Sequence, residues 1–242
     1  MTRPAAALAS IVALTVAVAA QRGAGVAIRL IDVADSAGIT LLNLHGGPDK
    51  DYIVDANGNG AAFFDFDNDG DLDALLVNGS TRERLAEGGD PIAAMYRNDD
   101  GRFRDVTAAS GLTARGWGMG ACVADVDNDG FQDVYITAFG PNALFRNRGD
   151  GTFADVTTAA GVGDGRWSTG CAFGGDLDND GDIDILVVNL NDRPTLLRNE
   201  TAAANHWVTL RLVGGSTPLT AAAGRVGAVA ASSNRDGSAH AW

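Results

Sequence analysis

The sequence predicts an all-β protein, a β-propeller-like array of four-stranded antiparallel blades with about three full blades in an incomplete ring. The first observation is an internal repeat: three Asp-rich segments begin at Asp65, Asp125 and Asp176, which lie 60 and 51 residues apart. A fixed period near 50 residues is typical of repeat architectures. The second observation is the composition, because Asp and the 32 Gly residues favour turns over helices.

Each repeat carries the same series of short stretches, which we expect to be strands. One apolar stretch follows each Asp-rich segment, a second ends in Arg-Asn, and a third has the pattern Phe-x-Asp-Val-Thr. They are rich in Val, Ile, Phe and Tyr and are separated by Gly, Asn and Asp, as strands and turns are. With the strand before each Asp-rich segment, this makes four strands per repeat within residues 28–200. A tandem β-solenoid is the alternative. The apolar stretches after the Asp-rich segments are residues 74–78, 134–138 and 185–189, and those ending in Arg-Asn are residues 95–98, 144–147 and 196–199. The Phe-x-Asp-Val-Thr stretches are residues 103–107 and 153–157, and residues 31–39 resemble another copy of this third kind.

The first 20 residues predict a signal peptide. Arg3 is followed by an apolar run over residues 5–20 that ends in small side chains, which is the secretory pattern. A membrane anchor is the alternative, but the run is shorter than the roughly 20 residues that a spanning helix needs. We therefore expect a secreted or periplasmic protein that has no stable membrane insertion after cleavage.

The charge balance excludes two classes of partner. The chain has 31 acidic and 18 basic residues, a formal net charge of −13. Nucleic acids and anionic membrane surfaces both require basic surfaces, so we expect neither as a partner. An Asp-rich chain suits a cationic partner, and a hard metal ion is the first candidate.

The three Asp-rich segments share the pattern D-x-D-N-D-G-x-x-D, which we interpret as a calcium site. Positions 1, 3, 5 and 9 supply carboxylates, position 7 supplies a backbone carbonyl, and Gly at position 6 allows a sharp turn. Calcium takes six to eight oxygen ligands, and the clustered carboxylates would repel one another without a cation. We therefore expect about three calcium ions. The predicted ligands are Asp65, Asp67, Asp69, Asp71 and Asp73; Asp125, Asp127, Asp129, Phe131 and Asp133; Asp176, Asp178, Asp180, Asp182 and Asp184.

Three other interpretations of these segments are weaker. An EF-hand needs Glu at position 12 of its loop, where this chain has Leu76, Ile136 and Val187. Solvated turns are common places for Asp, but turn preference alone rarely repeats every ligand position three times. Magnesium demands a tighter octahedral geometry than such loops offer.

The Asp pattern followed by an apolar strand resembles the FG-GAP or VCBS repeat of integrin α subunits. The elements Phe-x-Asp-Val-Thr and Leu-Phe-Arg-Asn, with the sequence NHWVTLRLVG at residues 205–214, are similar to exported bacterial FG-GAP proteins that carry an ASPIC/UnbV domain, and to cartilage acidic protein. The resemblance covers residues 28–214. It implies calcium held by the Asp residues named above, and a propeller that is usually seven-bladed.

The chain departs from this family pattern in two respects. Three blades are fewer than seven, and the ASPIC/UnbV-like segment breaks off after Gly214. We therefore expect a truncated or internally deleted relative whose blades do not close into a ring. Residues 215–242 are rich in Ala, Gly and Ser, and we expect a low-complexity, disordered tail.

We expect an exported calcium-binding module without catalysis, which binds an unidentified protein or glycan. His45, His206 and His240 are scattered, and no Ser, His and acid set recurs with the repeats. The alternative is a catalytic or non-catalytic scaffold fragment of a propeller enzyme, a lyase or a hydrolase. A purely structural repeat without a partner is the third possibility.

The two cysteines, Cys122 and Cys171, lie just before equivalent Asp-rich segments of neighbouring repeats. Export would permit a disulfide between them. The sequence does not define their separation, and we expect two separate buried side chains instead.

Overall fold

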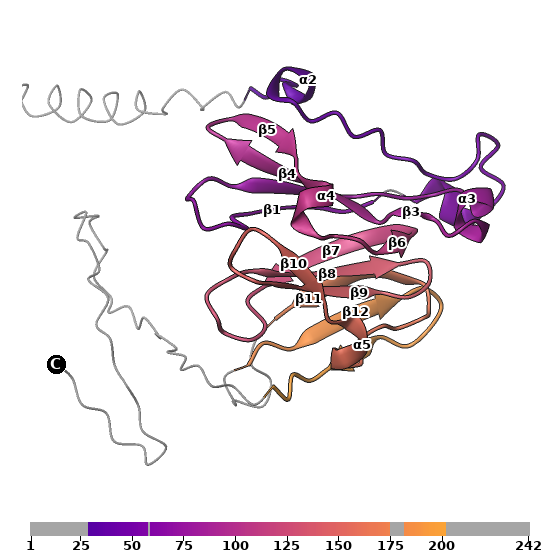
Figure 1. Ribbon diagram of the computed structural model, residues 1–242. Coiled ribbons are helices and arrows are strands. Elements are labelled where there is room, and N and C mark those ends of the chain that lie inside the picture. The colour runs from indigo at the N-terminus through magenta and orange to yellow at the C-terminus, as the bar shows by residue number, and fades with distance from the viewer. Residues whose placement is uncertain (1–28, 58, 175–181, 202–242) are drawn as a thin grey trace, which may run out of the picture. The chain divides into compact units, whose positions relative to one another are not determined.

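The computed structural model describes residues 29–57, 59–174 and 182–201 (Figure 1). The predicted signal peptide at 1–20, the segment at 205–214 and the tail at 215–242 lie outside these ranges. The chain divides into two units, Met1–Val33 and Ala34–Trp242, and residues 29–33 of the first unit have neither helix nor strand. In the described part of the chain, no helix has the length and apolar character needed to cross a membrane.

The second unit confirms the predicted all-β architecture of antiparallel blades, one for each repeat. In blades 1 and 2 every strand pairs with its neighbour in the sheet, in an antiparallel meander of four strands. The order in blade 1 is β1 (Ala61–Phe64), β2 (Asp73–Val77), β4 (Ala93–Asp99) and β5 (Arg102–Asp105). The order in blade 2 is β7 (Gly118–Ala124), β8 (Asp133–Ala138), β9 (Ala143–Asn147) and β10 (Phe153–Asp155).

Blade 3 has three strands among the described residues, in the order β11 (Ser168–Phe173), β12 (Ile185–Asn189) and β13 (Thr195–Leu197). The fourth strand predicted for each repeat is therefore confirmed in two blades and has no counterpart in the described part of the third. A separate two-stranded ribbon joins β3 (Asp90–Pro91) to β6 (Arg115–Gly116).

The Asp-Val-Thr element ends the outer strand of a blade and begins a short helix. Asp105 accepts the backbone N–H of Thr107, and the Thr107 hydroxyl oxygen accepts the N–H of Met95 in the adjacent strand β4. These bonds satisfy donors at the helix start and tie it to the sheet. Blade 2 repeats them with Asp155, Thr157 and Leu144. The helices are α4 (Thr107–Ser110) and α5 (Thr157–Ala160), and the other short helices are α2 (Ala34–Ala37), η1 (Ile53–Ala56) and α3 (Arg82–Ala86).

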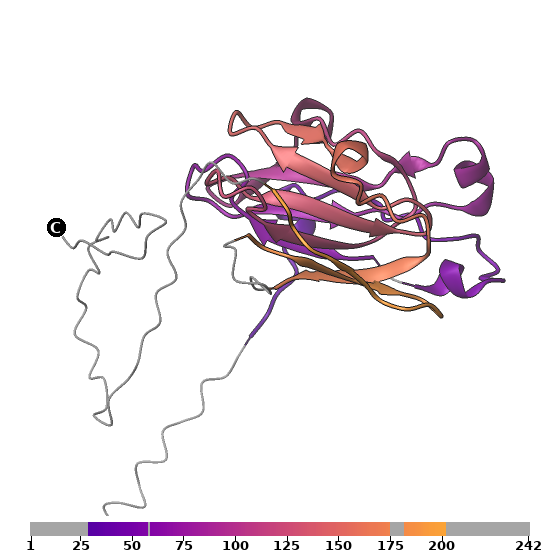
Figure 2. The same ribbon diagram turned by 90° about the horizontal axis from the view of Figure 1, so that it is seen from below.

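The core lies between blades rather than within one blade. The largest cluster of buried apolar side chains joins Leu75 and Met95 of blade 1 to Ile136 and Phe145 of blade 2. A second cluster joins blade 2 to blade 3. Figure 2 shows the sheets stacked face to face, so the middle sheet is covered on both sides. This explains why all six residues of β8 are buried and why its sequence does not alternate.

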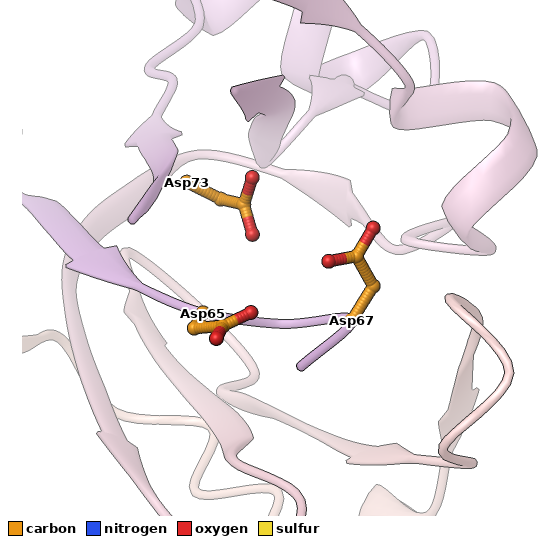
Figure 3. A group of neighbouring side chains, drawn as sticks. All are labelled: Asp65, Asp67 and Asp73. Carbon is orange, nitrogen blue, oxygen red and sulfur yellow. The ribbon is translucent and has the colours of Figure 1, made fainter. Parts of the chain in front are cut away.

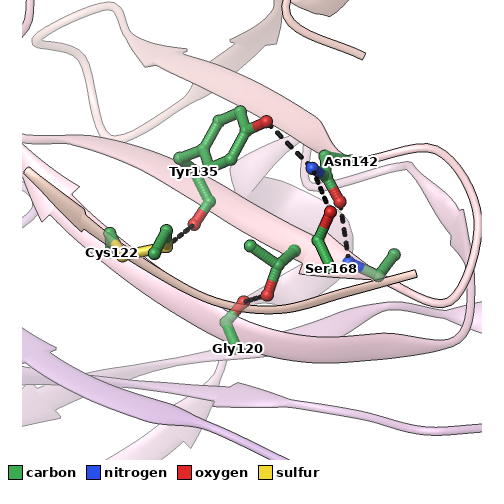
Figure 4. Close-up of a disulfide and its surroundings, with 8 residues drawn as sticks. Gly120, Cys122, Tyr135, Asn142 and Ser168 are labelled. Atoms are coloured by element: carbon green, nitrogen blue, oxygen red, sulfur yellow. Dashed lines mark hydrogen bonds between the residues drawn. A yellow bond between two sulfur atoms is a disulfide. The ribbon is translucent and has the colours of Figure 1, made fainter. Parts of the chain in front are cut away.

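A buried polar network also holds blade 3 against blade 2 (Figure 4). The Asn142 side-chain amide donates to the Tyr135 hydroxyl at 3.0 Å and to Ser168 Oγ at 2.9 Å, and Asn142 Oδ1 accepts the N–H of Ala138. Ser168 in turn donates to Asn189 at 2.8 Å. Because Asn142 and Ser168 are buried, each of these bonds avoids an unpaired polar group between the blades.

The expectation of two separate cysteines is wrong, because Cys122 and Cys171 form a disulfide (Figure 4). They lie on β7 and β11, the first strands of neighbouring blades, with Cα atoms 6.0 Å apart. Face-to-face packing brings the equivalent positions of two blades together, and this distance depends on the arrangement of blades, which the sequence alone does not define.

We predict that the double variant Cys122→Ser/Cys171→Ser unfolds at a lower temperature than the wild-type protein. The disulfide closes a sequence separation of 49 residues, and a loop of this size restricts the unfolded chain enough to contribute about 2–4 kcal/mol. Calorimetry with and without reductant measures this difference. Reductant should lower the wild-type midpoint and leave the variant unchanged; two titratable thiols in the unreduced wild-type protein would contradict the bridge.

Candidate metal centres

The Asp-rich segments of blades 1 and 2 fold into the same loop between the first two strands. Asp65 accepts the backbone N–H groups of Asp69 and Gly70, which curls the chain around the first carboxylate. Asn68 and Gly70 have φ of 58° and 97°. A left-handed backbone favours Asn and Gly, which explains the Asn-Asp-Gly sequence at positions 4–6.

The loop of blade 2 repeats this geometry. Asp125 accepts the N–H groups of Asp129 and Gly130, and Asn128 and Gly130 have φ of 54° and 91°. The role predicted for Gly70 and Gly130 is therefore confirmed at both positions.

Each of these loops gathers the carboxylates at positions 1, 3 and 9 into one cluster. Asp65, Asp67 and Asp73 each offer an oxygen within 4.8 Å of the others, and Asp125, Asp127 and Asp133 do the same in blade 2. In Figure 3 the first three side chains surround one common space, with Asp73 entering from the start of β2. Like charges at this separation repel strongly unless they bind protons or a cation.

The carboxylate at position 9 is buried and oriented by two backbone donors. Asp73 accepts the N–H of Phe66 in its own loop at 3.0 Å and that of Asn98 in β4 at 2.8 Å. Burial nevertheless raises the pKa of the Asp73 carboxyl above its usual range. The protein thus holds a negative group in a site that disfavours negative charge, which is expected where a cation completes the site.

Asp133 has the same two kinds of backbone donor in blade 2, and burial raises its pKa by a large amount. It accepts the N–H groups of Val126 at 2.9 Å and Asn147 at 2.7 Å, and it is fully buried. Burial, assisted by the charges of Asp127 and Asp129, raises the pKa of Asp133 to about 7, although the two hydrogen bonds oppose this rise.

Asp67 gives the direct test of whether a metal ion fits. Its Oδ1 atom is buried and accepts no hydrogen bond, and burial together with the charge of Asp69 raises its pKa. A buried oxygen without a donor is costly in a folded protein. The cluster offers only carboxylate oxygens, which suit hard divalent cations such as calcium and do not suit soft metals. The residues present therefore fit the predicted ion.

Positions 5 and 7 lie outside these three-carboxylate clusters. Asp69 and Asp129 each accept the N–H of position 7, from Asp71 and Phe131 respectively. The Asp71 carboxylate accepts the N–H of Asp100 at 3.1 Å, in the turn between β4 and β5. The ligand roles predicted for positions 5 and 7 stay predictions.

Arg146 lies over the loop of blade 2 and pairs with two of its acids. Its guanidinium contacts Asp127 and lies 2.9 Å from Asp129, and it is about half exposed. This Arg belongs to the recurring Arg-Asn pair, but its equivalents Arg97 and Arg198 pair with Asp99 and Glu200 instead. Screening by solvent keeps such an exposed pair weak.

The third loop is described only at its end. Asp176, Asp178 and Asp180 lie outside the described residues, as does Gly181. Asp182 and Asp184 are both buried, and Asp184 accepts the N–H of Asn199 at 2.8 Å. The Asp at position 9 thus has the same main-chain donor in all three blades.

The Asn of the Arg-Asn pair is a site residue to which sequence reasoning assigned no role. The Asn147 side-chain amide donates to the Phe66 carbonyl in the loop of blade 1 at 2.7 Å and to Gln132 O of its own loop at 3.2 Å. Asn199 donates likewise to the Val126 carbonyl in the loop of blade 2 at 2.7 Å. The recurrence of Arg-Asn in every repeat was the signal that could have identified this residue.

The Asn at position 4 makes a second contact between loops. Asn68 donates to the Gly130 carbonyl in the next loop at 3.3 Å, and Asn128 donates to Asp182 at 3.1 Å. Hydrogen bonds therefore join each loop to its neighbour, from position 4 of one loop and from the Asn of the Arg-Asn pair in the following blade.

We predict that the Asp133 carboxyl titrates near pH 7 in the calcium-free protein and well below that in excess calcium. Protonation is easier in the folded chain than in the unfolded one, whose Asp pKa is about 3.8. This group therefore costs the calcium-free protein stability as the pH rises from about 4 towards 7. Carbon-13 NMR of the Asp carboxyls measures both pKa values. A pKa near 4 without calcium would contradict the burial of this charge.

We predict that Asn147→Ala destabilises the protein more than Asn98→Ala does. Asn98→Ala is the control, because it removes only a hydrogen bond within one blade, from the Asn98 side-chain amide to the Leu72 carbonyl. Asn147→Ala removes the corresponding bond within its blade and also leaves the buried Phe66 carbonyl of blade 1 without the Asn147 amide as its donor. The expected losses are about 1–3 kcal/mol for Asn147→Ala and about 0.5–1.5 kcal/mol for Asn98→Ala. Denaturant unfolding gives both free energies; equal losses would show that the contact between blades contributes nothing.

Comparison with known families agrees with this geometry. A family model for an FG-GAP-like repeat matches residues 65–136 and again residues 125–187, so that the two matches cover all three Asp-rich segments and more than half of the chain. A search of curated proteins found no match. The repeated loops, the blades that follow them and these matches together show that the chain belongs to the FG-GAP-like repeat family.

Proposed function

We propose that the protein is an exported, non-catalytic module in which calcium ions hold the loops between the first two strands of each blade, leaving other surfaces to bind a protein or a glycan. The observation that carries this proposal is the pair of equivalent carboxylate clusters at Asp65, Asp67 and Asp73 and at Asp125, Asp127 and Asp133. Bound calcium would supply the positive charge that these buried carboxylates lack.

The role of each ligand group follows from its surroundings. Asp73 and Asp133 are oriented by backbone N–H groups and hold the end of each loop against the third strand. Asp65 and Asp125 shape the loop through their contacts with its backbone, and Asp67 offers the oxygen that accepts no hydrogen bond. Carboxylates that hold a cation are ionised, so they are poor candidates for proton transfer. This favours a binding role over catalysis.

A cavity at the opposite ends of the strands supports a binding role. It has a volume of about 630 Å³ and is lined by Tyr52, Leu85, Phe139 and Trp167, among others. The Arg82 guanidinium lies 3.9 Å from the centre of the Tyr52 ring. Aromatic and Arg side chains are enriched at protein–protein interfaces. Export is supported by the disulfide, because such bridges persist in oxidising compartments.

We predict that the folded protein binds about three calcium ions and that Asp127→Ala lowers this number by one. The ligands of each loop are local in sequence, so removal of one carboxylate should abolish one site and leave the others. Native mass spectrometry and calorimetric titration measure the stoichiometry. Asp49→Ala is the matched control, because it removes an equal charge from an exposed position outside the loops.

Two results would count against the calcium proposal. One is a wild-type protein that binds no calcium at millimolar concentration. The other is an Asp49→Ala variant that loses as many calcium sites as Asp127→Ala does. The first result would make the loops ordinary acidic turns, and the second would mean that calcium responds only to net charge.

A further inference from the structure

The Arg of the recurring Arg-Asn pair contacts different partners in blades that are otherwise equivalent. In blade 2 the Arg146 guanidinium contacts Asp127 and lies 2.9 Å from Asp129, and both acids belong to the candidate metal loop. In blade 1 the Arg97 guanidinium lies 2.7 Å from Asp99, which is outside the loop. A positive charge of the chain itself therefore lies on the loop of blade 2, whereas the Arg of blade 1 is directed to another acid.

The residue two positions after the Arg accounts for this difference. On an extended chain, side chains two positions apart point to the same side. This residue is Asp99 in blade 1 and Glu200 in blade 3, and each pairs with the Arg of its own blade. In blade 2 it is Arg148, which has the same charge as Arg146 and cannot pair with it. Arg146 pairs with the acids of the loop instead.

The Arg lies near the loop in both blades, so the difference is one of partner and not of place. In blades 1 and 2 the Asn that follows the Arg donates its backbone N–H to the Asp at position 9 of the loop. This bond fixes the Arg one residue away from a contact with a candidate ligand. Arg97 and Asp67 also line one cavity of about 420 Å³, although Arg97 pairs with Asp99.

Arg146 and a bound cation would act on the same carboxylates. Asp127 is one of the three clustered carboxylates of its loop, and it is also an acid that Arg146 contacts. A divalent ion and a guanidinium about 6 Å apart repel each other enough to weaken binding roughly tenfold in water, and physiological salt reduces this to roughly threefold. Because Arg146 is about half exposed, calcium can displace it, but calcium then binds with lower affinity.

We propose that Arg146 is an internal cation that competes with calcium at the loop of blade 2, and that the residue two positions after the Arg determines whether a loop has such a competitor. This inference rests on the proposed function, because it concerns the regulation of the calcium site. With Arg148 in place, the loop of blade 2 keeps a positive charge on its acids when calcium is absent, and it binds calcium only at a higher concentration than it otherwise would.

A calcium titration followed by nitrogen-15 NMR tests the proposal for each loop separately. The amides of Gly70 and Gly130 report on the two loops, because each donates to the first Asp of its own loop. Arg146→Gln should raise the calcium affinity of the blade 2 loop at least about threefold and leave the blade 1 loop unchanged, and the gain should shrink as salt is added. Arg97→Gln is the matched control, because it removes the same charge from the equivalent position but takes no ion pair from a loop.

A second variant tests the role of residue 148. Arg148→Asp should also raise the calcium affinity of the blade 2 loop, because the new carboxylate can pair with Arg146 as Asp99 pairs with Arg97. When Arg146→Gln is already present, Arg148→Asp should add less than it does in the wild-type chain, because no guanidinium is left to withdraw from the loop.

The possible failures separate this inference from the proposed function. Unchanged affinity of the blade 2 loop in Arg146→Gln, or an equal gain at the blade 1 loop in Arg97→Gln, would overturn the competition while calcium binding itself stands. An equal effect of Arg148→Asp with and without Arg146 would overturn the role of residue 148, since that residue would then act only through its own charge. Calcium binding at neither loop in any variant would overturn the proposed function and this inference with it.

Discussion

Each blade buries one carboxylate at the start of its second strand, and the arrangement of the loop depends on how that charge is satisfied. Asp73 and Asp133 accept one N–H from their own loop and one from the third strand of the blade. These bonds fasten the loop to the sheet, but they do not remove the cost of burial, as the raised pKa of Asp133 shows. The remaining stabilisation has to come from a proton or a cation, and a divalent cation would satisfy the carboxylates at positions 1 and 3 at the same time.

The same loops also connect the blades. Asn147 orients Asp133 through its backbone and reaches the loop of blade 1 through its side chain, so one residue links a candidate ligand to the next candidate site. The disulfide and the network around Asn142 connect blades 2 and 3 nearer the strands. Because most of the core lies between the sheets, the stability of one blade depends on its neighbours, as is typical of repeat proteins.

Sequence reasoning succeeded where the cause was local. The period, the strands and the turn at Gly70 and Gly130 follow from side chains that act within a few residues of one another. It failed where the cause lay between blades: Cys122 and Cys171 meet only because two sheets stack, and Asn147 reaches a loop that is 81 residues away along the chain. The sequence also did not predict that Leu186 is exposed, because the apolar stretch around it is typical of a buried strand. Only the structure shows that this side chain is 43% exposed.

The central claim is that calcium in the loops stabilises the blades, and a thermal melt in excess calcium and in EDTA, at equal ionic strength, tests it most directly. Extracellular calcium modules with a Kd of about 0.1–1 mM gain roughly 0.6–1.8 kcal/mol per site at about 2 mM calcium. We expect the two clusters described here to raise the midpoint by several degrees. An unchanged midpoint would show that the carboxylates are satisfied without the metal, and it would contradict the account.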